Sequence, residues 1–155
     1  MKNLDSLPYR SGVGMMVFND KKKIFVGRRI DNQNAWQMPQ GGVDKDENFE
    51  DAAKRELFEE TGIQSIRIIQ QSKKEYVYDL PKNLIGKIWK GKYKGQRQYW
   101  FLIKFLGPDS EINIHQNKPE FSEWKWVDMK DLPELIVPFK KNLYLSVIDE
   151  FSKSI

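Results

Sequence analysis

Three glutamates near the middle of the chain have a spacing that suits metal-dependent chemistry. Glu56 lies three and four residues before Glu59 and Glu60, so on a helix their carboxylates are close neighbours that repel one another. Carboxylate oxygens are preferred ligands of hard divalent cations, and one or more such ions would relieve the repulsion. The spacing therefore predicts a divalent metal site.

The helical phase places these acids where a charge is costly. Every fourth residue from Phe49 to Leu57 is apolar, and at about 3.6 residues per turn Glu56 and Glu60 fall on this apolar stripe or at its edge. A buried charge without a partner is strongly unfavourable. Arg55 can pair with one carboxylate, which leaves two others for a metal ion. The simpler alternative is a solvated acidic helix.

The rest of the chain is basic. Residues 41–63 contain eight acidic and three basic side chains and carry about −5, whereas the whole protein carries +4, so the remainder carries about +9. A basic body of this kind suits a polyphosphate or nucleic-acid ligand. The alternative is that the lysine excess only aids solubility.

Composition limits the class of protein. The 155 residues are 39% hydrophobic and 31% charged, which predicts one soluble globular domain over residues 1–155. No apolar run approaches the ~20 residues of a membrane span, and the N-terminus has no apolar signal segment. Cysteine is absent, which excludes disulfides and thiolate chemistry and favours a cytoplasmic location.

The elements that must position the acids can be predicted from periodicity and turn residues. Asn48 is a plausible N-cap and Gly62 a plausible C-terminal cap for the acidic helix, which follows a glycine turn at residues 36–42. Strands outnumber helices and the long helix lies between strands, which favours a mixed sheet with helices on both faces. The other predicted elements are strands at 12–18, 23–30, 65–80 (strand, turn and strand), 97–106 and 123–127, a basic loop at 82–96 with a short strand near residues 88–89, and helices at 131–136 and from 139 onward.

The pattern across residues 41–63 resembles the Nudix box, the signature of the Nudix hydrolases. The matching residues are Gly41, Glu47, Arg55-Glu56-Leu57, Glu59-Glu60 and Gly62-Ile63. Further likeness to the branch of bacterial RNA pyrophosphohydrolases and dinucleoside polyphosphate hydrolases extends over nearly the whole chain. It lies in residues 9–10, 13–14, 36–42, 96–101, 119–121, 124–126 and 139–140.

The resemblance implies an α/β (α+β) fold, an α/β/α sandwich with a mixed sheet. It implies hydrolysis of a phosphoanhydride with Mg²⁺ or Mn²⁺, with more than one ion. By matching, Glu56, Glu59 and Glu60 are metal ligands and the Gly41 carbonyl is a backbone ligand. Glu120, outside the box, is a further ligand or the base that takes a proton from water.

The remaining site residues are assigned to support or to substrate binding. Glu47 and Arg55 are expected to hold the loop and orient the carboxylates. The expected phosphate, sugar and base contacts are Arg10, Arg29, Tyr78, Gln98, Val137, Phe139 and Lys140. For Phe139 the alternative is a core residue that opens the last helix.

Three functions compete at this point. The first is removal of phosphates from the 5′ end of triphosphorylated or diphosphorylated RNA, and the second is the same chemistry on dinucleoside polyphosphates. The third is a non-catalytic nucleotide- or RNA-binding module, which would predict a damaged box, whereas here the box is intact. We expect a monomer that acts on neither DNA nor membranes.

Overall fold

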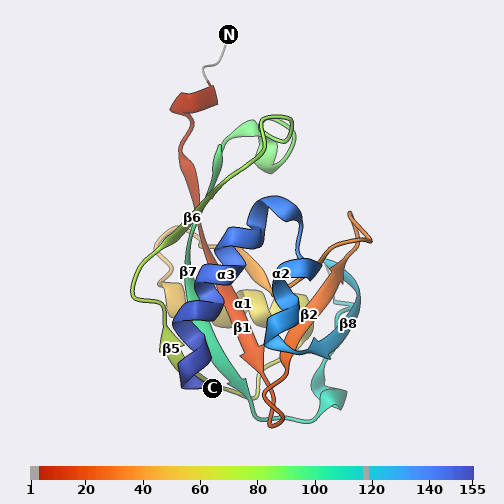
Figure 1. Cartoon of the computed structure of the whole chain (residues 1–155). Helices are drawn as coiled ribbons and strands as arrows, with labels where there is room; N and C mark the ends of the chain where they lie inside the picture. The colour runs from red at the N-terminus through yellow and green to blue at the C-terminus, as the bar shows by residue number, and fades with distance from the viewer. Residues whose placement is uncertain (1–3, 117–118) are drawn as a thin grey trace.

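A mixed β-sheet forms the centre of the structure, a computed structural model that describes residues 4–116 and 119–155 (Figure 1). The strands are β1 (Tyr9–Phe18), β2 (Ile24–Arg29), β3 (Trp36–Gln37), β4 (Gln40–Gly42), β5 (Ile66–Gln71), β6 (Tyr76–Asp79), β7 (Gly95–Phe105) and β8 (Phe121–Val127). The main path runs β3-β2-β1-β7-β5, while β4 pairs with β1, β6 with β7 and β8 with β2. The pair β1 and β7 is parallel and the other pairs are antiparallel, so the predicted mixed sheet is confirmed.

Helices cover both faces of this sheet. The α-helices are α1 (Phe49–Thr61), α2 (Leu132–Leu135) and α3 (Lys141–Phe151). Short 3₁₀ turns are η1 (Leu4–Ser6), η2 (Trp89–Gly91), η3 (Asp109–Glu111), η4 (Met129–Asp131), η5 (Pro138–Lys140) and η6 (Ser152–Ser154). None of the helices in the described part of the chain combines the length and the apolar character needed to cross a bilayer.

The alternation of side chains along β1 divides the core in two. Val13, Met15 and Val17 pack in the cluster that includes α1, whereas Met16 and Phe18 pack in the cluster that includes α2 and α3. Successive residues of a strand point to opposite faces, so one buried strand serves both clusters. The predicted α/β/α layering is therefore confirmed.

Both predicted caps of α1 are present. The Asn48 side chain accepts a hydrogen bond from the Asp51 amide at 2.8 Å, and Gly62 has φ 74° and donates its amide to the Phe58 carbonyl. A left-handed C-terminal residue is best supplied by glycine, since no Cβ then strains the backbone. The caps set where α1 begins and ends, and so fix the placement of its acidic last turns.

The segment that leads into α1 is held from both sides. The Met38 amide donates to the Tyr144 hydroxyl at 2.9 Å, and the Met15 amide donates to the Pro39 carbonyl at 2.9 Å. Tyr144 belongs to α3, so a helix on one face of the sheet positions the turn that enters the helix on the other face.

One predicted strand is absent, and the predicted start of the last helix is wrong. Residues near 88–89 form no strand but the turn η2, because Gly86 and Gly91 have positive φ and bend the backbone. The last helix begins at Lys141, two residues later than predicted, since Pro138 opens a separate 3₁₀ turn before it.

The Tyr144 hydrogen bond leads to a stability prediction. Tyr144→Phe leaves the Met38 amide without its acceptor in the core, so the free energy of unfolding should fall by about 1–3 kcal/mol. Urea denaturation measures this change. Tyr99→Phe is the matched control, because the Tyr99 hydroxyl has no hydrogen bond among the described residues. Equal effects of the two substitutions would contradict the role of the Tyr144 hydroxyl.

Candidate active site

A cleft of about 1030 Å³ brings most of the predicted site residues together. It is lined by residues from the start of β1, the end of β2, β4, the last turns of α1, β6 and the turn before α3. The predicted site residues that line it are Arg10, Arg29, Gly41, Glu56, Glu59, Glu60, Tyr78, Glu120, Val137, Phe139 and Lys140.

Glu60 is the most buried acid of the cleft. Its side chain is 6% exposed, and its Oε2 atom has no hydrogen-bond partner among the described residues. Burial raises the pKa of Glu60 well above its usual value, and the charges of Glu56 and Glu120 raise it further. A hydrogen bond with the Gln40 backbone acts in the opposite direction and lowers this pKa. Because an unpartnered buried carboxylate is costly, Oε2 is an oxygen ligand suited to a cation.

Arg55 ties the acids of α1 to the loop before it. Its Nε and Nη2 atoms bind the Glu47 carboxylate at 2.8 and 2.9 Å, and Nη2 also donates to the Gly42 carbonyl at 3.0 Å. Its Nη1 atom binds Glu56 at 2.9 Å and Glu59 at 3.2 Å. The hydrogen bonds from Arg55 lower the pKa of Glu47 to about 2. Neither Arg55 nor Glu47 lines the cleft, which agrees with a supporting position.

Two glycines allow β4 to pass close to the charged side chains. A Cβ on Gly41 would lie 2.0 Å from the Glu56 carboxyl carbon, and a Cβ on Gly42 would lie 2.4 Å from an Arg10 guanidinium nitrogen. Any side chain at Gly41 would therefore displace the Glu56 carboxylate. The glycine pair seen in the sequence has this close approach as its physical reason.

The carboxylates do not already converge as a metal cage. Within residues 4–116 and 119–155, no group of three or more His, Cys, Asp or Glu side chains is arranged to hold a metal ion. Glu56 and Glu59 are instead turned toward Arg55. Burial raises the pKa of Glu56 while the Arg55 contact opposes that rise. Their carboxylate oxygens are nevertheless of the ligand type that hard divalent cations prefer.

Aromatic and basic groups form another wall of the cleft. The Tyr78 hydroxyl donates to Gln96 at 2.8 Å, and burial raises the pKa of Tyr78 to about 12. The Tyr78 and Phe139 rings lie 6.0 Å apart, with the Lys140 amine 5.1 Å from the Tyr78 ring centre. Lys140 is 3% exposed, and burial together with the charge of Arg29 lowers its pKa to about 7.

The two arginines of the cleft already have partners in the protein. Arg29 binds Asp31 through two hydrogen bonds of 2.8 and 2.6 Å, which lowers the pKa of the Asp31 carboxyl. The Arg10 guanidinium lies over the Trp89 ring at 5.3 Å. Both side chains are therefore held at the cleft in a defined orientation.

The prediction that Gln98 contacts the substrate is wrong. Gln98 is fully buried on β7, where its amide donates to the Gln40 side chain at 3.0 Å and accepts from the Trp100 indole at 3.1 Å. The side chains of Gln40, Gln96 and Trp100 surround Gln98 through hydrogen bonds, and Gln98 does not line the cleft. Gln98 instead orients Gln40, which does line it.

Several cleft residues were not predicted from the sequence. They come from segments whose position in space depends on the whole fold, and they include Asp31, Asn32, Gln40, Leu80, Leu84, Ile88 and Trp89. The one sequence signal for the last three was the mixture of apolar residues and lysines between residues 82 and 96.

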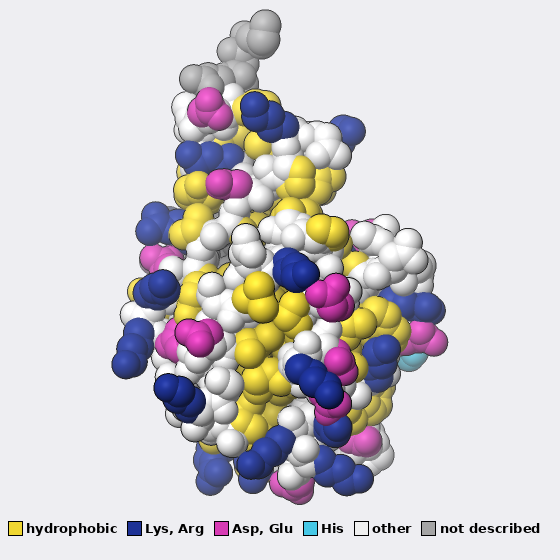
Figure 2. Space-filling view, in the orientation of Figure 1, with side chains coloured by type: hydrophobic (Ala, Val, Ile, Leu, Met, Phe, Trp, Pro, Cys, Tyr) yellow, Lys and Arg dark blue, Asp and Glu magenta, His cyan; other side chains and the backbone are white. Residues whose placement is uncertain are grey.

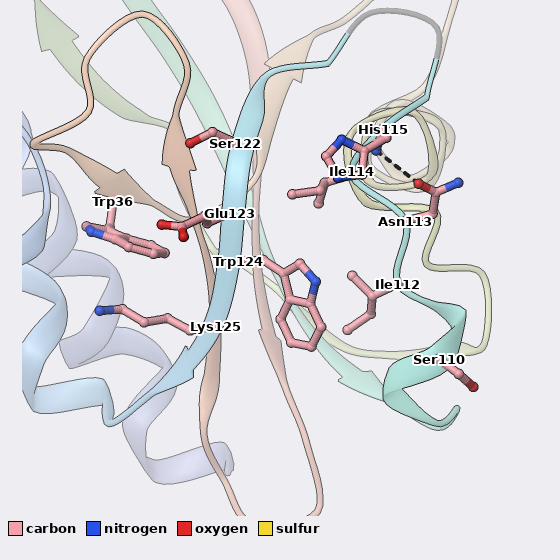
Figure 3. A pocket seen from close by; sticks show the side chains of 10 residues that line it. All are labelled: Trp36, Ser110, Ile112, Asn113, Ile114, His115, Ser122, Glu123, Trp124 and Lys125. Carbon is pink, nitrogen blue, oxygen red and sulfur yellow. Dashed lines mark hydrogen bonds between the residues drawn. The ribbon is translucent and has the colours of Figure 1, made fainter.

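A second cavity, of about 700 Å³, lies along β8 and contains none of the predicted site residues. Figure 3 shows Trp36 and Lys125 on one side of β8 and Trp124 and Ile114 on the other. The only acid in its lining, Glu123, is paired with Arg28 at 2.8 Å. This cavity lacks a cluster of acids, so the larger cleft is the candidate active site.

Relatives with high sequence identity share one name. The RNA pyrophosphohydrolase of Sphingopyxis alaskensis is 55% identical over 150 residues, which cover 95% of each chain. The RNA pyrophosphohydrolase of Pelagibacter ubique is 54% identical over 146 residues, which cover 94% of this chain and 92% of the relative.

Solved structures with low identity share the fold. The dihydroneopterin triphosphate pyrophosphohydrolase of E. coli superposes with a TM-score of 0.68 at 19% identity, covering 90% of this chain and 96% of that one. A C. elegans Ap4A hydrolase gives 0.65 at 17% identity, covering 92% and 98%. The NUDIX domain family model matches residues 8–147. The chain therefore belongs to the NUDIX domain family, whose members generally use a divalent metal.

Proposed function

We propose that this protein is an RNA pyrophosphohydrolase. It removes pyrophosphate or phosphate from the 5′ end of triphosphorylated or diphosphorylated RNA and leaves a 5′-monophosphate, which promotes RNA decay. The observation that carries the proposal is the buried Glu60 carboxylate, with an unpartnered oxygen, in a cleft that also holds Arg10, Arg29 and Lys140. The names of relatives about 50% identical over nearly the whole chain support the RNA substrate.

Oxygen ligands from α1 and β4 would hold the metal. Glu56, Glu59, Glu60 and Glu120, with the Gly41 carbonyl, form a ligand set suited to Mg²⁺ or Mn²⁺, and their number suits more than one ion. The metal, when bound, supplies positive charge that offsets the phosphate charge and acidifies the attacking water. Arg55 and Glu47 orient the ligands, since the Arg55 guanidinium joins Glu47, Glu56 and Glu59.

The other cleft residues bind and orient the substrate. Arg10, Arg29 and Lys140 bind phosphate oxygens or the sugar through charge-assisted hydrogen bonds. The Phe139 ring, with Val137 beside it, forms an apolar wall on which a base can stack. Tyr78 supports that wall, since its ring lies beside both the Phe139 ring and the Lys140 amine.

A cleft carboxylate accepts the proton of the attacking water. Glu60 and Glu120 are the two candidates, because both line the cleft beside the other acids. The buried position of Glu60 favours a ligand that stays in place, and the exposed position of Glu120 favours a group that exchanges protons with solvent. We assign the base role to Glu120 on this ground.

The domain organisation, location and oligomeric state of the protein are inferred together with its substrate. We propose a single domain over residues 1–155 that acts as a cytoplasmic monomer on RNA 5′ ends and not on DNA. Hydrolysis of dinucleoside polyphosphates is the alternative main activity, because the same phosphoanhydride chemistry and the same cleft would serve it. The complete box argues against a non-catalytic binding module.

A side-by-side assay tests the choice of substrate. Triphosphorylated RNA, diphosphorylated RNA and diadenosine polyphosphates are offered at equal concentration with Mg²⁺ at several salt concentrations. We expect kcat/KM to be higher for RNA, by about 10-fold, and to fall more steeply with salt, because a polymer has more phosphates to contact. Faster turnover of the dinucleotides, with equal salt sensitivity, would make the alternative activity the main one.

Substitution of Glu60 tests the metal site without an activity readout. In EDTA, Glu60→Gln should be at least as stable as wild type at pH 7, because a raised pKa means that the ionised Glu60 weakens the fold as pH rises above 4.5. Metal at one hundred times its Kd should stabilise wild type by about 2.7 kcal/mol and the variant by much less. Thermal unfolding with and without MgCl₂ or MnCl₂ measures both effects.

Glu50→Gln is the control for this experiment, since Glu50 is an exposed acid in the first turn of the same helix. It should leave the metal-induced shift unchanged. An undiminished shift in Glu60→Gln would remove Glu60 from the ligand set. RNA turnover should also be mostly abolished in Glu60→Gln while the protein stays folded.

The lowered pKa of Lys140 predicts a pH dependence of substrate binding. Below pH 7 the amine is protonated and binds phosphate, whereas above pH 7 the free protein holds it neutral. Lys140→Met should therefore raise KM by about 10-fold at pH 6, and this difference should shrink as pH rises above 7. Lys141→Met, which removes an exposed neighbour paired with Glu134, should show no such trend. A constant ratio across pH 6 to 9 would contradict the assignment.

A further inference from the structure

The connection between β6 and β7, residues 80–94, projects from the sheet as an arm. Figure 1 shows the arm beyond the body of the molecule, beside the N-terminal end of β1, and the Lys94 amide donates to the Pro8 carbonyl at 3.0 Å. The arm contains five lysines and no acidic residue, so it carries about half of the excess positive charge of the chain outside residues 41–63. Figure 2 shows Lys and Arg side chains over the projecting part.

The arm has an apolar side and a basic side. Leu84, Ile88 and Trp89 line the same cleft as the glutamates. The exposed lysines are Lys82, Lys87, Lys90 and Lys92, and none of them forms an ion pair within the part of the chain that the structure describes. The cleft therefore continues from the acids along an apolar wall to a surface of uncompensated positive charge.

The backbone of the arm is strained where Trp89 enters the cleft. Trp89 and Lys90 have φ of 51° and 58°, a left-handed conformation that is unfavourable for bulky side chains. Hydrogen bonds from Gly91 to Ile88 and from Lys92 to Trp89 hold this turn. Strain of this kind persists where it positions a functional side chain. Here it places the indole under the Arg10 guanidinium, at 5.3 Å.

A partly exposed tryptophan beside unpaired lysines has the chemistry of a single-stranded nucleic-acid site. Bases stack on the aromatic ring without sequence preference, and the lysines follow the phosphates. A dinucleoside polyphosphate carries its phosphates between its two nucleosides and has no chain to extend along the arm. A polynucleotide has both the further bases and the further phosphates.

We propose that the arm binds the RNA chain downstream of its 5′-terminal nucleotide. Trp89 stacks on the base of one of the next nucleotides, and Lys82, Lys87, Lys90 and Lys92 bind the phosphates that follow. This assignment rests on the proposed function, and it makes the arm the element that distinguishes an RNA 5′ end from a small dinucleotide.

A double-mutant cycle, with one change in the protein and one in the RNA, tests whether Trp89 stacks on a base. Trp89→Ala is combined with triphosphorylated RNA that is abasic at the second, third or fourth nucleotide. For RNA without an abasic site, kcat/KM should fall about 5- to 100-fold in Trp89→Ala and recover in Trp89→Phe. At one of the three positions the abasic RNA should lower kcat/KM for wild type and cause no further decrease in Trp89→Ala.

If abasic RNA lowers kcat/KM by the same factor in wild type and in Trp89→Ala at all three positions, the stacking is overturned. The effect of Trp89→Ala would then act through its Arg10 neighbour or through stability. Thermal unfolding of both variants separates the stability effect. Unchanged kcat/KM in Trp89→Ala would overturn the proposal directly.

Salt dependence tests the lysines. In Lys87→Gln/Lys92→Gln, the slope of log kcat/KM against log salt for RNA should become shallower by about two, since each of the two lysines would otherwise neutralise one phosphate. The control Lys21→Gln/Lys153→Gln removes two exposed lysines of equal charge away from the arm and should keep the wild-type slope. Equal slopes in the two double variants would overturn the binding of phosphates by these lysines.

The same assays separate the two levels of inference. If wild type fails to hydrolyse triphosphorylated RNA, the proposed function is wrong and the arm assignment is wrong with it. If wild type hydrolyses RNA and the arm variants behave as wild type does, only the arm assignment is wrong.

Discussion

The active-site cleft depends on the balance between the acids of α1 and the single guanidinium of Arg55. Five acidic or carbonyl partners share that one cation, namely Gly42, Asp44, Glu47, Glu56 and Glu59. Charge repulsion between neighbouring carboxylates would otherwise oppose the helix, since residues three and four apart face each other. None of these hydrogen bonds reaches Glu60. Its buried Oε2 atom has no hydrogen-bond partner within the described part of the chain, and a metal ion would supply the positive charge that it lacks.

Arg55 also connects helix α1 to the sheet. Its bonds to Glu47 and Gly42 join α1 to the loop and to β4, and β4 in turn pairs with β1 in the centre of the sheet. On the other face, Tyr144 of α3 holds the Met38 amide just before β4. The turn that carries Gly41 is therefore fixed from both layers, which keeps a backbone carbonyl and the carboxylates in one place.

The cleft combines opposite charges in a small volume. Its acids are those at the end of α1, Glu120 and Asp31, while its cations come from β1, β2 and the turn before α3. A polyphosphate in the cleft can therefore contact basic groups while it lies close to carboxylate oxygens. The buried Lys140 and the stacked Arg10 show that the cations are held by aromatic neighbours, Tyr78 and Trp89, and not only by acids.

The sequence by itself determined the acidic helix, its two caps and the glycine turn before it, because these depend on spacing and local backbone chemistry. It also determined the mixed sheet with helices on both faces, since strand and helix order constrain how apolar faces can be buried. The Nudix box residues share one local segment, so their grouping near one another follows from sequence spacing alone.

Only the tertiary structure decided which distant residues join them. Gln98 was expected at the substrate, yet the side chains of Gln40 and Trp100 cover it, and Gln40 lines the cleft instead. The residues near 88–89 were expected in a strand, yet two glycines with positive φ turn them into a bend that carries Trp89 to the cleft. The burial of Gln98 depends on segments far away in the chain, and the approach of Trp89 to the cleft depends on where the sheet places its loop, so a local pattern could not reveal which residues line the cleft.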